Sequence, residues 1–369
     1  MHVIDSLFIG GAERMLIDIA NQTALDGHQV SIGITRSGNK LSNELRSEIS
    51  LHMIDRSHCF DIPGMKRFSA LVKKKKVDIF HAHGRSTFSF LAFLKTFGLI
   101  CPPIVLHDHF GGIENDTSIP LWFRLWAKHW VSYYVGVYSK LGLWAKAAGI
   151  PPEKITVIKN ALDPSRIQKA EPKNIRKTFG IESKSPIGIV VGGIRREKGI
   201  DILLNTFAKS SHQKSANIIF VGGARNTDYT RACRNQSTSL KLDDNVFFVG
   251  ERQDVPSLIK SVDFALLPSR SESGPLVLIE YMIGGLPFVS TQVGAISRQI
   301  AQLKVPEFVN PNDPESFAKA LDDLLNLSPE QRIKRGKAGQ DIALRNFDIR
   351  QKISQWYAVY NQVLVKLKT

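Results

Sequence analysis

Short apolar runs alternate with amphipathic helical segments along nearly the whole chain, and this alternation constrains the fold more than any other feature. The runs typical of buried strands form two series, separated by a stretch near residues 160–170. The first series is predicted at residues 2–7, 29–34, 77–80, 104–107, 135–137 and 155–158, and the second at residues 187–191, 217–221, 246–249, 263–267 and 286–290. Strands that alternate with helices form parallel sheets covered on both faces. We therefore predict an α/β protein with two doubly wound domains.

The length of 369 residues also favours two domains. No run of 18 or more apolar residues occurs, so a membrane-spanning helix is not expected. The three cysteines, Cys59, Cys101 and Cys233, lie far apart and show no metal-binding spacing. The start of the chain lacks the charged leader and apolar core of a signal peptide. These features favour a cytoplasmic location.

The net charge of +15 predicts an anionic partner, which could be nucleic acid, anionic lipid or a phosphorylated substrate. The run from Lys73 to Lys76 is typical of a solvated helix end, with attraction to an anionic membrane as the second interpretation. Trp122, Trp126 and Trp130 share one helical stripe. We expect this stripe to pack against the sheet, although membrane insertion and acceptor contact are alternatives.

The stretch from Phe264 to Gly294 carries the first motif that indicates a ligand. An apolar strand ends at Pro268, a polar turn follows, and Pro275 begins an apolar helix. Such a turn directs backbone N–H groups and the positive end of a helix dipole at one spot, which suits a phosphate. Glu272 and Glu280 flank this spot, and carboxylates suit hydroxyl groups. Phosphate and hydroxyl groups together are typical of a nucleotide sugar.

A second motif follows the strand at residues 187–191. Glycines end the strand, and a basic loop with Arg195, Arg196 and Lys198 leads to Gly199 and a helix. Three cations at the carboxyl end of a strand can neutralise a diphosphate, and arginine adds planar bidentate hydrogen bonds. This clustering favours an enzyme over a nucleic-acid-binding protein, which would interleave basic and exposed aromatic residues on one face.

Two histidine pairs each follow a predicted strand. His81 and His83 form the first pair, and His107 and His109 the second. Residues two apart share a face of a strand, so each pair could converge on a ligand. A metal site of four histidines is conceivable, but no helical HExxH motif and no acidic partner set accompanies them. We therefore expect no metal.

These motifs, in this order, resemble the signature of glycosyltransferase family 4, the group 1 glycosyl transferases, across nearly the whole chain. The resemblance implies a retaining transferase of GT-B fold, with two Rossmann-like domains facing across a cleft and a C-terminal helix crossing back to the first domain. It implies an acceptor-side domain of residues 1–165 plus 349–369 and a donor-binding domain of residues 166–348.

The resemblance also implies the roles of the site residues. Lys198, helped by Arg195 or Arg196, would stabilise the diphosphate, since Gly193 stands where the family has an arginine. Glu272 would bind hydroxyls of the donor sugar and Glu280 those of the ribose. His109, with His107 as the second choice, would orient the sugar. The remaining implied residues are Ser273, Gly274, Pro275 and Leu276 at the phosphate, Gly250 at the base, Gly10 and Gly11 over the donor, and His83 and Asn160 on the acceptor side.

We therefore expect transfer of a sugar from a UDP- or GDP-linked donor to a hydroxyl of a glycan or lipid-linked acceptor, in cell-surface polysaccharide or lipopolysaccharide synthesis. The expected partners are the nucleotide sugar, the acceptor and an anionic membrane surface on the inner face of the plasma membrane, without nucleic acid. No cofactor or metal is expected. The alternatives are a GT-B protein that binds a sugar nucleotide without transfer, which the glycine at Gly193 suggests, and a basic nucleic-acid-binding protein.

Overall fold

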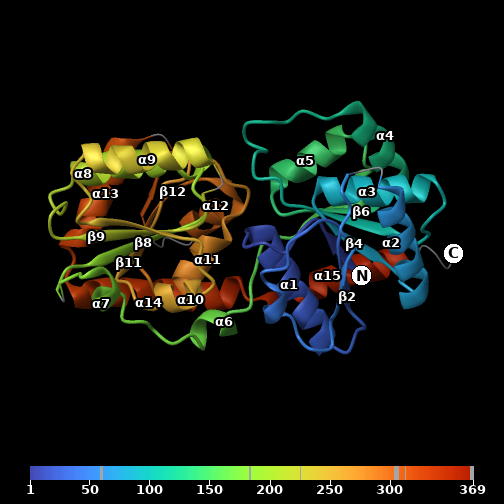
Figure 1. The fold of residues 1–369 in the computed structure, drawn as a ribbon, viewed down its shortest axis with the longest axis horizontal. Helices are drawn as coiled ribbons and strands as arrows, with labels where there is room; N and C mark the ends of the chain where they lie inside the picture. The colour runs from blue at the N-terminus through green and yellow to red at the C-terminus, as the bar shows by residue number, and fades with distance from the viewer. Residues whose placement is uncertain (59–60, 183, 225, 303–306, 312, 366–369) are drawn as a thin grey trace. The chain divides into compact units, whose positions relative to one another are not determined.

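The computed structural model describes residues 1–58, 61–182, 184–224, 226–302, 307–311 and 313–365. The chain forms two compact units (Figure 1). Unit 1 consists of Met1–Leu162 and Ile349–Thr369, and unit 2 of Asp163–Asp348. The sequence prediction placed this boundary at residue 165. Each unit is an α/β layer structure with a parallel sheet between helices.

Unit 1 contains a seven-stranded sheet in the order β3-β2-β1-β4-β5-β6-β7. Its strands are β1 (His2–Ile4), β2 (Ser31–Ile34), β3 (Ser50–Met53), β4 (Phe80–His83), β5 (Ile104–Asp108), β6 (Val131–Gly136) and β7 (Ile155–Val157). All neighbouring strands are parallel. The order reverses between β1 and β4, as in a doubly wound fold.

The helices of unit 1 include one from the far end of the sequence. They are α1 (Gly11–Leu25), α2 (Ile62–Lys75), α3 (Arg85–Thr96), α4 (Leu121–Trp130), α5 (Ser139–Ala147) and α15 (Ile349–Val365), with 3-10 turns at Ser42–Glu44 and Pro152–Lys154. Apolar residues of α1 pack on β1 and β2, where Leu16, Ile17 and Ile32 are buried. Helix α15 lies against α1 and β6, so the chain returns to unit 1, as the resemblance implies.

Unit 2 contains a six-stranded parallel sheet in the order β10-β9-β8-β11-β12-β13. Its strands are β8 (Ile187–Val191), β9 (Asn217–Val221), β10 (Val246–Gly250), β11 (Phe264–Leu267), β12 (Phe288–Thr291) and β13 (Glu307–Val309). Here the order reverses between β8 and β11, and both strands are buried along nearly their whole length.

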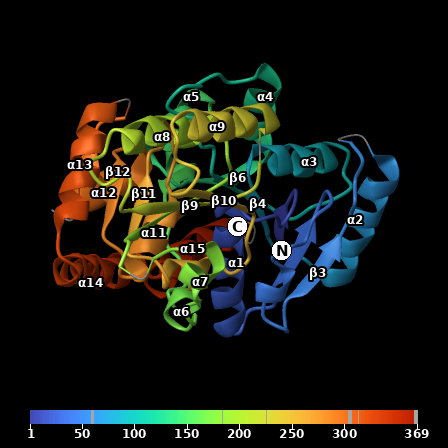
Figure 2. The same cartoon turned by 60° about the vertical axis from the view of Figure 1, so that its left-hand side comes forward.

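Helices cover both faces of this second sheet. They are α6 (Ser165–Gln168), α7 (Ile175–Phe179), α8 (Ile200–Ala208), α9 (Thr227–Ser239), α10 (Val255–Ile259), α11 (Leu276–Ile283), α12 (Gly294–Gln302), α13 (Pro314–Asn326) and α14 (Pro329–Asn346), with a 3-10 turn, η3, at Arg196–Lys198. Helix α13 packs against α8 and β12 (Figure 2). The main core contains Leu203 and Phe207 of α8 with Phe317 and Leu321 of α13.

Strand β4 begins later than predicted. The sequence prediction placed a strand at residues 77–80, but β4 is Phe80–His83. His81 and His83 therefore lie within the strand instead of following it, and both are buried. The prediction followed the apolar residues and treated histidine as a polar residue that ends a strand.

Helix α4 corrects a second expectation. The tryptophan stripe does not form the core, because the buried residues of α4 are Phe123 and Ala127. Trp122 is 48% exposed, and Leu121 and Leu125 are more exposed still. Among the residues that the structure describes, no helix combines the length and the apolar character needed to cross a bilayer.

Candidate functional site

The strongest candidate site lies in unit 2, at the carboxyl ends of β8 and β11. In open α/β sheets, ligands bind outside the carboxyl ends of the strands, where the strand order reverses. The chain leaves β8 through a glycine-rich basic loop that ends at Gly199, and it leaves β11 through the turn that ends at Pro275. Both sequence motifs therefore meet at the switch point of this sheet.

An ion pair joins the two loops. Lys198 Nζ lies 2.5 Å from Glu272 Oε1, and Ser269 Oγ donates to the same carboxylate oxygen at 2.9 Å. The side chains of Lys198 and Glu272 are only 13% and 11% exposed. Because both charges are largely removed from water, each depends on the other for compensation. The site thus holds a cation and a carboxylate in one place without a net charge.

Glycine is required where the basic loop meets the second loop. Gly199 has φ +64°, and a Cβ atom there would lie 2.0 Å from the Pro268 carbonyl oxygen. The left-handed conformation and the close approach of backbone both exclude a side chain. Gly199 therefore lets the lysine loop lie directly against the end of β11.

A second network fixes the outer part of the same loops. Arg270 donates two hydrogen bonds of 2.7 Å to the Asp201 carboxylate and a third, of 2.8 Å, to the Arg196 carbonyl. Tyr229 donates to Asp201 at 2.5 Å. Burial opposes ionisation of Asp201, but the hydrogen bonds from Arg270 and Tyr229 outweigh it and lower the pKa of this carboxyl. The network ties the turn after β11 to the start of α8.

Helix α11 supplies the third side of the site. Pro275 is its N-cap and Leu276 its first residue, and the first amides of a helix have no intrahelical acceptor. Glu280, one turn further along, forms an ion pair with Arg166 of α6, and both side chains are largely buried. Tyr281 accepts a hydrogen bond from the Val191 amide at 2.8 Å, which ties α11 to the end of β8.

The two arginines of the basic loop are exposed. Arg195 is half exposed and lies 3.9 Å from Glu197, and Arg196 is also exposed. The neighbouring Ile194 is buried and pairs with Ala224 across a bridge. The loop therefore presents both guanidinium groups to solvent.

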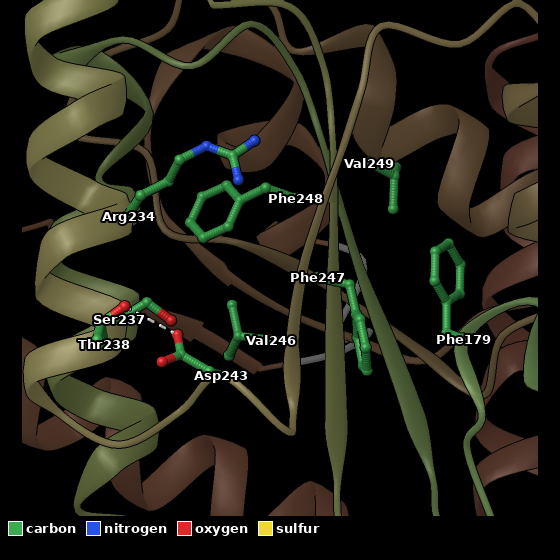
Figure 3. A pocket seen from close by; sticks show the side chains of 9 residues that line it. All are labelled: Phe179, Arg234, Ser237, Thr238, Asp243, Val246, Phe247, Phe248 and Val249. Atoms are coloured by element: carbon green, nitrogen blue, oxygen red, sulfur yellow. Dashed lines mark hydrogen bonds between the residues drawn. The ribbon is translucent and has the colours of Figure 1, made fainter.

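A pocket of about 310 Å³ lies elsewhere in unit 2, along the edge strand β10 (Figure 3). Arg234 of α9 lies over the Phe248 ring at 4.8 Å, and Thr238 donates to Asp243 at 3.1 Å. The lining ends at Val249, one residue before Gly250, whose carbonyl accepts from Gly222 at 2.8 Å. None of the predicted site residues lines this pocket.

The predicted site residues of unit 1 lie at the start of α1 and at or beyond the carboxyl ends of β4, β5 and β7. Gly10 and Gly11 begin α1, where the Glu13 carboxylate folds back over Gly10. His83 ends β4 and His109 follows β5, with nearly parallel rings whose centroids are 5.7 Å apart. Asn160 is buried after β7.

Within unit 2, the structure brings together Lys198 and Glu272 directly and places residues 273–276 beside them. It also adds partners that the sequence did not indicate. Arg166 lies 114 residues from Glu280, and Arg270 and Asp201 are 69 residues apart. No local pattern marks such long-range pairs, so only the fold reveals them.

Comparison with known proteins agrees with this architecture. The sequence profile described as Glycosyltransferase Family 4 matches residues 9–166, and the profile described as Glycosyl transferases group 1 matches residues 171–341. Among curated proteins, N-acetyl-alpha-D-glucosaminyl L-malate synthase of Bacillus anthracis is 23% identical, and the match covers 96% of this chain and 95% of that enzyme. D-inositol 3-phosphate glycosyltransferase of Corynebacterium urealyticum is 28% identical over 44% of this chain and 39% of that protein.

Solved structures show the same fold. Alr3699/HepE of Anabaena, crystallised with UDP and glucose, matches with a TM-score of 0.80, 20% identity and 98% coverage of both chains. WaaG, a glycosyltransferase involved in lipopolysaccharide biosynthesis, matches with a TM-score of 0.74, 18% identity and coverage of 96% of this chain and 97% of that one. The fold and the profile matches define a glycosyltransferase of GT-B fold. The chain belongs to glycosyltransferase family 4.

Proposed function

We propose that the protein transfers a sugar from a UDP- or GDP-linked donor to a hydroxyl of a glycan or lipid-linked acceptor, with retention of configuration at the anomeric carbon. The bond from that carbon to the diphosphate oxygen breaks, and the acceptor oxygen forms the new bond. The acceptor proton leaves with the diphosphate. Cell-surface polysaccharide or lipopolysaccharide synthesis is the process that this reaction serves.

The observation that carries the proposal is the ion pair of Lys198 and Glu272 at the switch point of unit 2. A diphosphate group that enters this site replaces the carboxylate as the partner of Lys198, which stabilises the negative charge that develops as the sugar bond breaks. Glu272 is then released to accept hydrogen bonds from sugar hydroxyls. The one contact between Lys198 and Glu272 therefore holds in place both the residue that binds the diphosphate and the residue that binds the sugar.

The surrounding residues extend this assignment. Amides from Gly274 to Leu276 at the start of α11 support the phosphates, and Glu280, held by Arg166, accepts from the ribose hydroxyls. Arg195 or Arg196 supplies a further cation from the exposed part of the loop. In unit 1, we assign His109 to orientation of the sugar, Gly10 and Gly11 to donor contact, and His83 and Asn160 to the acceptor side. In unit 2, Gly250 is assigned to the base.

The donor class and the metal requirement follow from the same chemistry. Anabaena HepE was crystallised with UDP and with UDP-glucose, which supports a nucleoside diphosphate sugar as the donor. Lys198 provides at the diphosphate the positive charge that a divalent ion provides in other transferases. We therefore propose transfer without a metal or another cofactor.

We also propose that unit 1 contacts an anionic membrane surface through one face of α4. Trp122, Trp126, Phe93 and Phe97 form a continuous series of ring contacts between α4 and α3. Leu121 and Leu125 are 72% and 56% exposed, and Arg124 and Lys128 are also exposed on this helix. Exposed aromatic and aliphatic side chains beside cations are typical of helices that bind at lipid headgroups. The site of action is then the inner face of the plasma membrane.

The transfer proposal is tested with sugar nucleotides and one matched pair of variants. Wild type, Glu272→Gln and Glu315→Gln are incubated with UDP- and GDP-sugars and a membrane extract, and released nucleotide and glycosylated product are measured. Glu315 is exposed in α13 and serves as the control. We expect turnover with one donor class, a fall of at least 100-fold in Glu272→Gln and no change in the control. Unchanged turnover in Glu272→Gln would remove the site assignment.

A vesicle assay tests the membrane proposal separately. The double variant Trp122→Ser with Leu125→Ser is compared with Ile333→Ser, which replaces an apolar residue of unit 2 that is 69% exposed. We expect the double variant alone to lose sedimentation with phosphatidylglycerol vesicles. Equal sedimentation of all three proteins would contradict the proposal.

A further inference from the structure

Five histidines gather on adjacent strands of unit 1. This histidine cluster consists of His2 of β1, His81 and His83 of β4, His107 of β5 and His109. The parallel register places His2 beside His81 and His83 beside His107. Ring centroids of neighbouring members lie between 3.8 and 5.7 Å apart.

Burial keeps the cluster uncharged. His2, His81, His83 and His107 are at most 4% exposed. Burial lowers the pKa of His109 to about 4 and that of His2 to about 3, and it holds the pKa values of the other three members of the cluster well below the usual value for histidine. Neutral imidazole is the form that binds metal ions.

The hydrogen bonds leave two ring nitrogens unused. His83 Nε2 lies 3.1 Å from His2 Nδ1, and His107 Nδ1 lies 3.1 Å from His81 Nε2. The opposite nitrogens, His83 Nδ1 and His107 Nε2, are buried and have no hydrogen-bond partner among the described residues. A buried polar atom without a partner costs free energy. Each of these two rings is thus held by one nitrogen and offers the other.

We propose that His83, His107 and His109 form a binding site for a divalent transition-metal ion, with Zn²⁺ as the reference ion. One ring nitrogen from each residue lies within 4.8 Å of those of the other two, so a single ion can be shared among the three residues. Three imidazoles suit Zn²⁺, Co²⁺, Ni²⁺ and Cu²⁺ and leave a coordination position open for water or another ligand. His109 is less buried than the other two ligands.

Tyr360 of α15 positions the metal ligand His107, and it does so through His81. Its hydroxyl lies 2.7 Å from His81 Nδ1, and His81 Nε2 faces His107 Nδ1. When His107 Nδ1–H donates to His81 and His81 Nδ1–H donates to Tyr360, His107 Nε2 carries the lone pair that can bind a metal ion. The partner of a ligand's second nitrogen fixes its tautomer and orientation in this way. Trp356 packs on His81 and His107 with centroids 4.7 and 4.5 Å away and limits their rotation.

This site is distinct from the donor chemistry of unit 2. The proposed transfer uses Lys198 at the diphosphate and needs no metal, whereas the histidine site binds a metal with no donor present. His109 and His83 belong to both proposals, so a bound ion would withdraw His109 from the donor sugar and His83 from the acceptor side. Metal binding is measured without turnover, and its result therefore does not depend on whether the transfer proposal holds.

Calorimetry with Zn²⁺ alone tests the site. The full chain without an affinity tag, after treatment with a chelator, is compared with His109→Ala and with His129→Ala, an exposed control in α4. We expect one ion per chain in wild type and control, and an affinity at least 100-fold lower in His109→Ala. Absence of binding, or equal affinity in all three proteins, would overturn the proposal.

Two further measurements separate this site from other ligands and from a folding defect. Co²⁺ at the histidines gives visible d–d bands without a thiolate charge-transfer band, whereas a strong thiolate band would place the ion on a cysteine and would contradict the proposal. Tyr360→Phe keeps the ring and removes the hydroxyl. We expect a circular dichroism spectrum like that of wild type and a loss of about 10–100-fold in Zn²⁺ affinity. Unchanged affinity would overturn the positioning role.

Discussion

At the scale of single residues, the largely buried ion pair of Lys198 and Glu272 is the feature with the clearest consequences. Two charges removed from water are tolerated because each compensates the other, and loss of one partner leaves the other uncompensated. A diphosphate ligand can take over the role of Glu272, but a neutral ligand cannot. The pair therefore favours an anionic ligand over an uncharged sugar.

We expect Lys198→Met to lower kcat by about 10²–10³-fold, because it removes a cation aimed at the charge that develops on the leaving diphosphate. The measurement is steady-state release of nucleoside diphosphate. Lys209→Met, which replaces an exposed lysine beyond α8, is the control and should retain wild-type kcat. A kcat in Lys198→Met within threefold of wild type would contradict the role of the lysine.

Some residues of the candidate site could be predicted from the sequence, and others could not. Lys198, Glu272 and Glu280 could be found because each follows a strand or begins a helix in a recognisable motif. Arg166 could not be found, since its contact with Glu280 forms only when α6 packs beside α10 and α11. The histidines were noticed as pairs, but their convergence needed the register of β1, β4 and β5.

At the scale of elements, the turn between β8 and α8 depends on Gly199. Its conformation, φ +64°, is shared by Gly180, where a Cβ atom would meet nothing within 4 Å. The two glycines therefore separate the cost of backbone strain from the cost of the close contact with Pro268.

We expect Gly180→Ala to lower the free energy of unfolding by roughly 1–2 kcal/mol, the cost of a left-handed conformation with a side chain. Gly199→Ala should cost a further ~1–3 kcal/mol from overpacking against the Pro268 carbonyl. Thermal unfolding measures both, with about 2–4 °C per kcal/mol for a unit of this size. Equal melting temperatures of Gly180→Ala and Gly199→Ala would show that the close contact with the Pro268 carbonyl adds nothing to the cost of the substitution.

The elements themselves were predictable where they are buried and apolar. Strands β8 and β9 coincide with the predicted ranges, and the two-series alternation gave both sheets. Strand β3 was missed because its residues, Ser50–Met53, are only half buried and carry no apolar run. Strand β13, Glu307–Val309, was missed because it combines a short length with a charged first residue. Short strands at a sheet edge leave little pattern in the sequence.

At the scale of the whole molecule, the net charge of +15 is large for a chain of this length. Within unit 1, basic residues near the exposed apolar face of α4 would add electrostatic attraction to an anionic surface, at ~1 kcal/mol for each cation close to the lipid. Salt screens this attraction, whereas burial of apolar side chains is not weakened by salt.

We expect binding to phosphatidylglycerol vesicles to fall steeply as NaCl rises from 0.05 to 0.5 M, since the screening length shortens from more than 10 Å at low salt toward 3 Å. Vesicles of phosphatidylcholine should bind weakly at every salt concentration. Sedimentation at each concentration provides the measurement. Equal binding to both lipids would indicate an apolar interaction without a role for charge.

Removal and addition of metal should have different effects on the transfer rate. A chelator should leave the transfer rate within twofold of its starting value, because Lys198 serves the diphosphate. Added Zn²⁺ should inhibit, since it occupies His109, and His109→Ala should lose that inhibition in its residual activity. A rate abolished by the chelator and restored by Mg²⁺ would contradict the metal-independent transfer.

The central claim is that a nucleoside diphosphate sugar binds at the switch point of unit 2, between the loop that carries Lys198 and the start of α11. Hydrogen–deuterium exchange of the full chain with and without UDP, and in parallel GDP, locates the ligand most directly. The account predicts slower exchange in residues 192–199 and 269–280 with one of the two nucleotides, and no such change in Lys198→Met. Protection confined to the β10 pocket at residues 234–249, with none around Lys198, would contradict it.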